Sequence, residues 1–192
     1  MKFTTIPETT FQQLQLNAGV LLRNFDPASA EVDNADIIGA TSGGVTFAAV
    51  PSYSDFGDDI DNCPKNMLEL KNLDSWAITM GGSFVTVDTA AAKLLIAAAD
   101  AAENKVTPRN DITDEDFGDI WWVGDYSDKN GETNGGYIAI RMMNALSTGG
   151  FSLQTGDRAK GTFAFTFTAH YSMTAQETVP FEVYIKAGTE EA

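Results

Sequence analysis

The sequence predicts a mainly β protein, an antiparallel β-sandwich or barrel-like fold with one flanking α-helix. Residues 161–171 carry an aromatic residue or alanine at every second position, with threonine and alanine dominating the positions between. Side chains of a strand alternate between its two faces, so this period of two predicts a half-buried strand. Residues 177–186 repeat the alternation, with Phe181, Val183 and Ile185 predicted to point inward. Only residues 88–104 have the composition of a helix.

The N-terminal half contains two predicted strands before the first long loop. Residues 14–24 form the first. Asp26-Pro27 is expected to end it, because a proline pushes the residue before it towards extended or turn conformations. Gly43-Gly44 turns the chain into a second strand at residues 45–50, which Pro51 is expected to close. These two strands would begin the sheet.

Residues 51–66 are predicted to form a long loop. Tyr53, Phe56 and Ile60 occur there among serines and aspartates, without the period of a strand or a helix. Apolar side chains of this size are poorly placed in a solvated loop. Long loops within a compact domain are usually functional, so we expect this one to make a contact.

The middle of the chain is predicted to form strands and then the helix. Residues 76–87 are rich in β-branched and aromatic side chains, and Gly81-Gly82 within them is either a hairpin turn or a bulge. Asp88 or Thr89 is the expected N-cap of a helix over residues 88–104, which is mostly alanine and leucine. We expect this helix to pack flat on a sheet.

The last third of the chain is predicted to be β structure. Residues 128–136 have turn chemistry, and polar residues at 172–176 predict that the last two strands form an antiparallel pair. The strands predicted here cover residues 120–123, 137–143, 161–171 and 177–186. With seven to nine strands in all, we expect one domain over residues 1–192, including an N-terminal arm (1–13) and a C-terminal tail (187–192).

Composition sets limits on function. The chain has 192 residues and is 43% hydrophobic, enough for one domain with a substantial core. Its 27 acidic and 12 basic residues give a net charge of −15, which disfavours binding to nucleic acid or to an anionic membrane. Cys63 is the only cysteine, and no signal-peptide or membrane-spanning run is visible, so we expect a reducing compartment.

Residues that suggest catalysis or metal binding do not form a recognisable motif. Cys63 and His170 are the only residues of their types, and a thiol nucleophile with its base would need both. We interpret them as a passive cysteine and a surface or interface histidine. A cation could be surrounded by Asp55, Asp58, Asp59 and Asp61, but their spacing does not match a calcium-binding loop. We therefore predict no catalytic, cofactor-binding or metal-binding residue.

The order of several segments resembles a known family. These segments are the Phe11-Gln-Gln-Leu-Gln-Leu-Asn-Ala-Gly-Val-Leu-Leu run, Gly43-Gly44-Val45-Thr46-Phe47 before the loop, residues 73–87, the helix, Ile120-Trp121-Trp122 and residues 161–171. Together they are similar to the tail tube (major tail) proteins of long-tailed bacteriophages and related prophages. The resemblance covers most of the chain and rests on element order.

The resemblance implies a structural virion protein made in the bacterial cytoplasm. Subunits of that family form hexameric rings that stack into the hollow tail tube through which DNA is ejected. A negative lumen would let DNA slide without binding, in agreement with the charge of −15. The implied partners are the chain itself, a tape-measure protein, and tail terminator or baseplate proteins.

The resemblance also suggests which residues make contacts. We expect Tyr53, Phe56 and Ile60 to contact the next ring and Phe3, Phe11 and Leu14 of the N-terminal arm to contact a neighbour. Edge strands of the sheets could pair between subunits within a ring. One possible lumen surface is the threonine face that carries Thr162, Thr166 and Thr168.

The main alternative is a monomeric binding module, for example one that recognises carbohydrate. Its aromatic platform would come from Trp121, Trp122 or Tyr126. Adjacent tryptophans on one strand point to opposite faces, so at least one of the two is expected in the core. An enzyme is the third possibility.

Overall fold

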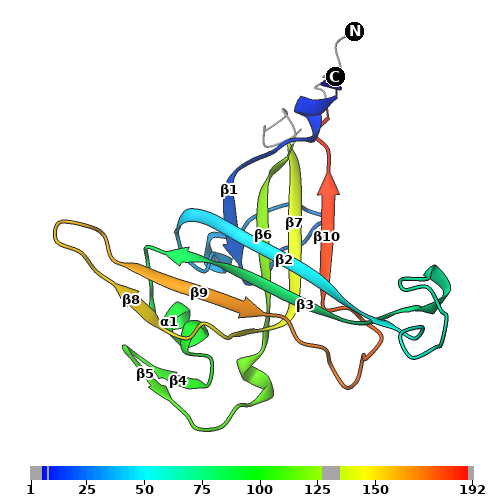
Figure 1. Ribbon diagram of the computed structural model, residues 1–192. Coiled ribbons are helices and arrows are strands. Elements are labelled where there is room, and N and C mark those ends of the chain that lie inside the picture. The colour runs from blue at the N-terminus through cyan, green and yellow to red at the C-terminus, as the bar shows by residue number, and fades with distance from the viewer. Residues whose placement is uncertain (1–5, 8, 127–134, 190–192) are drawn as a thin grey trace.

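The fold is mainly β, with antiparallel sheets and one α-helix (Figure 1). The computed structural model describes residues 6–7, 9–126 and 135–189, without the side chain of Phe11. Most of the turn predicted at 128–136 therefore lies outside the described residues. The strands are β1 (Gln15–Leu22), β2 (Thr41–Asp55), β3 (Lys71–Phe84), β4 (Ala99–Ala102), β5 (Lys105–Pro108), β6 (Gly118–Tyr126), β7 (Gly136–Ser147), β8 (Ser152–Gln154), β9 (Thr162–Thr168) and β10 (Phe181–Lys186). The helix is α1 (Thr89–Ile96), and short 3-10 turns cover Thr10–Gln13, Asn34–Asp36, Leu68–Leu70 and Asp114–Asp116.

Eight of the strands form one open sheet that bends at β7. Its order is β1-β6-β7-β9-β3-β2, with β10 also on β7 and β8 also on β9. The first part of β7 pairs with β6 and β10, whereas its last two residues, Leu146 and Ser147, pair with β9. We call β1, β6, β7 and β10 half-sheet 1, and β2, β3, β8 and β9 half-sheet 2. In Figure 1 the strands of half-sheet 2 cross those of half-sheet 1.

The main core lies where the two half-sheets face each other. Phe165 and Phe167 of β9 are buried there with Met80 of β3 and Met142 of β7, while Thr166 points to solvent. The alternation predicted from the phenylalanines is thus confirmed. Burying a large apolar side chain stabilises a fold by about 1.5–3 kcal/mol, so this contact holds the two half-sheets together.

A second cluster covers the opposite face of half-sheet 1. The connection between β1 and β2 passes over this face and buries Phe25. The Phe25 ring packs edge-on against Trp121 at 5.6 Å and Tyr137 at 5.5 Å between ring centroids. Half-sheet 1 is therefore covered on both faces over part of its length.

The predicted pairing of the last two strands is wrong. β9 pairs with β3, whereas β10 pairs with β7, because the chain between them crosses from half-sheet 2 to half-sheet 1. Phe181 packs against Phe47 and Trp76 in the core, as predicted. Val183 and Ile185 were also expected to point into the core but are exposed, since they lie further along β10.

The predicted helix over residues 88–104 is roughly half its expected length. Asp88 caps α1, its Oδ1 accepting a hydrogen bond from Ala91 N–H at 2.6 Å. The helix ends at Ile96, and the next residue, Ala97, has a φ of 67°. Residues 99–102 then form β4, which pairs with β5. Helix propensity fails here because the burial of Ala99 and the pairing of β4 with β5 together outweigh the preference of alanine for a helix. The other three residues of β4 are exposed.

The long loop begins later than the predicted 51–66 and covers residues 56–70. β2 continues through Pro51 to Asp55, which an outermost strand of a sheet tolerates. β2 has a bulge at Gly43-Gly44, where residues 42–44 oppose residue 83 of β3. The two glycines lie within the strand, so the turn and the strand start predicted there are wrong. Gly81-Gly82 lies within regular β3, and neither predicted alternative for it holds.

Candidate functional site

The β2–β3 hairpin extends well beyond the rest of the sheet. β9 pairs with β3 only over Thr79–Phe84, whereas β2 and β3 remain paired as far as Asp55 and Lys71. The hairpin therefore projects to one side as a two-stranded arm, at the right in Figure 1. We call residues 56–70, which connect its two strands, the tip.

Asp55 fixes the shape of the tip. Its carboxylate accepts hydrogen bonds from the N–H groups of Gly57 and Asn66, both at 3.0 Å, and lies 3.3 Å from Lys71 Nζ. The bond from Gly57 is the largest cause that holds the pKa of Asp55 below its ordinary value, and Asn66 and Lys71 act in the same direction against burial. The role of Asp55 is therefore to bind the two ends of the tip together.

The tip and the arm expose several large apolar side chains. Phe56 is 65% exposed and Leu68 is 84% exposed, although both belong to a well-bonded segment. The other exposed large apolar side chains here are Val50, Tyr53, Ile60, Met67 and Leu73. The sequence singles out Tyr53, Phe56 and Ile60, which the structure brings to the same arm. It does not single out Val50, which precedes the predicted loop 51–66, or Met67, Leu68 and Leu73, which follow it.

The N-terminal arm is described only in part. Leu14 follows the turn Thr10–Gln13 and is partly exposed, as is Ile6 near the chain start. Phe3 and the side chain of Phe11 lie outside the described residues. Leu14 is accessible for the contact predicted from the sequence.

The aromatic residues of the alternative binding site are mostly not available. Trp121 is buried, and Trp122 is half-buried with its Nε1–H donating to Ala18 O at 3.0 Å. The two indoles belong to opposite faces of β6, as predicted. Tyr126 is half-buried at the end of β6. These three side chains do not form an exposed platform for a sugar.

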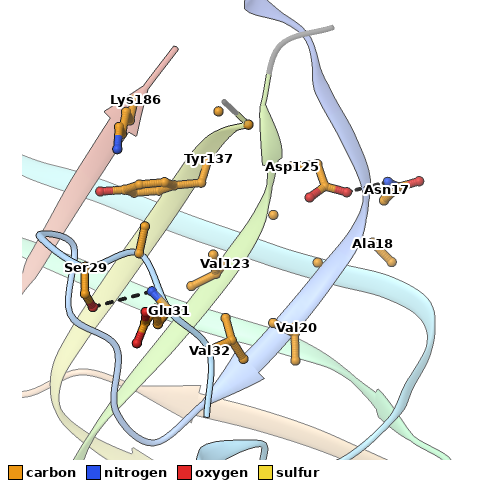
Figure 2. A pocket seen from close by; sticks show the side chains of 15 residues that line it. Asn17, Ala18, Val20, Ser29, Glu31, Val32, Val123, Asp125, Tyr137 and Lys186 are labelled. Atoms are coloured by element: carbon orange, nitrogen blue, oxygen red, sulfur yellow. Dashed lines mark hydrogen bonds between the residues drawn. The ribbon is translucent and has the colours of Figure 1, made fainter. Parts of the chain in front are cut away.

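An open groove of about 760 Å³ crosses the outer face of half-sheet 1 (Figure 2). Several of its polar groups bond to the protein itself: Asn17 Nδ2 donates to Asp125 Oδ2 at 2.6 Å, and Tyr137 Oη donates to Pro27 O at 2.6 Å. The Lys186 ammonium lies 6.0 Å from the Tyr137 ring centroid. The groove thus offers few free polar groups that converge on a ligand.

The residues considered for catalysis and metal binding lie in separate environments. The Cys63 sulfur contacts Met67 Sδ at 3.6 Å in the tip. His170 follows β9, where its ring packs edge-on against Phe117 and its Nδ1 lies 3.2 Å from Asn144 O. Within the described part of the chain, no three acidic, histidine or cysteine side chains cluster so as to hold a metal ion, Asp55 and its neighbours included.

Comparisons with protein-family models and with curated proteins found no relative of this chain. No protein-family model matches this chain, and no curated protein has a significantly similar sequence. Among the described residues no helix is long and apolar enough to cross a membrane.

Proposed function

We propose that this protein is a bacteriophage tail tube protein, whose rings stack into the hollow tube that conducts DNA. The observation that carries the proposal is the β2–β3 arm, a hairpin with a fixed tip that presents Phe56, Ile60 and Leu68 to solvent. Stacking of one ring on the next would bury these side chains. Several large apolar side chains exposed on one projecting segment are a common feature of interaction sites.

The position of the arm supports head-to-tail assembly. A projecting arm that contacts a different surface of the next copy makes a heterologous contact, and such contacts generate closed rings or open filaments. Each added copy would present a new free arm. Stacking could therefore continue without a fixed end point, as a tube requires.

The edge strand β10 supports contacts within a ring. It pairs with β7 in regular register, and Val183 and Ile185 along it are exposed. The other long edges are interrupted: β1 has a bulge with positive φ at Asn17 and Gly19, and β2 has Pro51 and its own bulge. An uninterrupted edge strand favours pairing with another chain. We infer that β10 makes such a contact with a neighbouring subunit.

Charge supports a passive conduit. A net charge of −15 opposes adhesion of DNA to the protein, so DNA could pass without specific binding. Thr166 and Thr168 lie on the outer face of half-sheet 2, a neutral surface that also carries Thr46 and Thr79. This face is our candidate for a surface that does not hold DNA. The tape-measure, terminator and baseplate partners form part of the same proposal.

The proposal is tested by the substitution Phe56→Ser. We expect it to abolish filaments seen by negative-stain electron microscopy, because it removes a large apolar group from the tip and touches no core residue. A matched control is Ile112→Ser, which removes an exposed apolar side chain far along the chain from the arm. Filaments that form equally well with Phe56→Ser would remove the tip from the interface.

A further inference from the structure

A recess of about 300 Å³ lies on the side of the molecule away from the hairpin tip. Its wall is formed by α1 (Ala90, Lys93, Leu94), by Arg23 after β1, and by residues 115–119 before and within β6. In Figure 1 α1 lies at the lower left, whereas the tip lies at the far right. A contact between tip and recess would therefore join opposite sides of two copies.

Of the charged side chains that line this recess and have no ion-pair partner in the described part of the chain, two are basic and one is acidic. Neither Arg23 nor Lys93 has a carboxylate within 4.0 Å in the described part of the chain. The recess also contains Asp116 and Asp119, which pair with Arg109 and Arg141, each at 2.6 Å. These arginines also pair with Asp100, Asp111 and Glu182, which do not line the recess. Glu115 is then its one acidic group without a cation in the described part.

The free charges of the tip are mainly negative. Asp55 and Lys71 pair with each other. The remaining charged side chains are exposed and comprise four acids, Asp58, Asp59, Asp61 and Glu69, against one base, Lys65. Three of these acids lie within three residues of Phe56 or Ile60 in the sequence, and both apolar side chains are exposed. The tip thus exposes apolar and acidic side chains together.

We propose that the tip of one copy docks in the recess beside α1 of the next copy. Arg23 and Lys93 would face the acids of the tip, while Leu94 and Ala90 would contact its apolar side chains. The contact is complementary in charge and uses two different surfaces, so it can propagate. This inference rests on the proposed function and identifies the surface that receives the arm.

Charge reversal tests the assignment. We expect Arg23→Glu with Lys93→Glu to raise the critical concentration for tube formation, measured by sedimentation, at least about tenfold. Adding Asp58→Lys and Asp59→Lys to the same chain should restore assembly, because the tip is then basic where the recess is acidic and the two surfaces are again opposite in charge. Arg158→Glu with Lys160→Glu, an exposed double reversal between β8 and β9, is the control because it makes the same change in net charge. Thermal unfolding of every variant confirms that it folds.

The outcomes separate this inference from the proposed function. If the wild-type protein forms tubes and Arg23→Glu with Lys93→Glu behaves like Arg158→Glu with Lys160→Glu, the recess is not the receiving surface, although tube formation stands. If the double reversal blocks assembly and the four-residue variant does not restore it, the pairing of tip with recess is wrong. A wild-type protein that forms no tubes at any concentration would overturn both.

Discussion

Two segments that extend from the sheet are built in a similar way but expose different surfaces. One is the hairpin tip (residues 56–70), and the other is the helical insert (residues 88–117) with α1, β4 and β5. Each is held by one aspartate that bonds to backbone N–H groups and a cation. Asp55 binds Gly57, Asn66 and Lys71, whereas Asp116 binds Thr113 N–H at 2.8 Å and Arg109 at 2.6 Å.

The difference between the two segments lies in their apolar side chains. The helical insert buries Ala91, Leu95 and Ala99 completely against the core. The tip, equally well bonded, leaves Phe56 and Leu68 in solvent. An aspartate that accepts several hydrogen bonds gives a segment a fixed shape, but only contact with the sheet buries its apolar surface. The tip makes no such contact within the described chain, and under the proposed function another copy would supply it.

Truncating leucine in each segment should give the largest contrast. We expect Leu95→Ala to lower the free energy of unfolding by about 2–5 kcal/mol, because it leaves a cavity in the core. Leu68→Ala should change it by less than about 0.5 kcal/mol, since that side chain is exposed in the monomer. Urea unfolding followed by circular dichroism measures both. Equal losses for the two variants would contradict the comparison.

The stability contributions of Asp116 and Asp55 should differ in size, and that of Asp116 should decrease at low pH. The bond from Thr113 N–H, with Arg109 acting in the same direction, holds the pKa of Asp116 below its ordinary value. The ionised carboxylate therefore stabilises the fold above the unfolded pKa of about 3.9, and this contribution is lost as pH falls through the lower folded value. We expect the stability deficit of Asp116→Asn relative to wild type to be larger at pH 7 than at pH 3.

The stability of Asp55→Asn, measured at the same two pH values, provides the comparison. Its pKa is also lowered, but its bonds lie within the tip, which can open without unfolding the core. We expect a smaller deficit in global stability than for Asp116→Asn. A deficit of Asp116→Asn that is the same at both pH values would show that its ionised form contributes nothing to the fold.

The smallest expected effect is local opening of the tip. A Cβ atom at residue 57 would lie 2.8 Å from Leu70 Cδ1 and 3.0 Å from Cys63 Sγ, so Gly57→Ala must displace these side chains. Hydrogen exchange at the Asn66 amide should become faster, while global stability changes by less than about 0.5 kcal/mol. Unchanged exchange at Asn66 would mean that the tip does not depend on close packing around Gly57.

Local patterns in the sequence predicted the β character but not the pairing of strands. The alternation of Phe163, Phe165 and Phe167 is a local signal, and β9 follows from it. The partner of β10 is not local, because the chain crosses between half-sheets before that strand begins. Ala99 likewise looks helical from its neighbours and becomes a strand residue only through contact with the core.

Several exposed apolar residues of the candidate site could be predicted from the sequence. The role of Asp55 in the tip and the recess that contains Arg23 and Lys93 could not. Phe56 and Ile60 stand out in a polar segment, and they are exposed as that contrast suggested. Asp55 was considered as a cation ligand, although an aspartate two residues before a glycine also indicates a turn bonded by its side chain. No local signal joins Arg23 with Lys93, which only the folded chain brings to one recess.

The most direct test of the central claim is negative-stain electron microscopy of the wild-type protein over a concentration series. We predict stacked rings or hollow tubes with a central channel, more numerous as concentration rises, because under the proposed function the apolar side chains exposed on the tip would be buried between copies. A monodisperse monomer at every concentration would contradict the account.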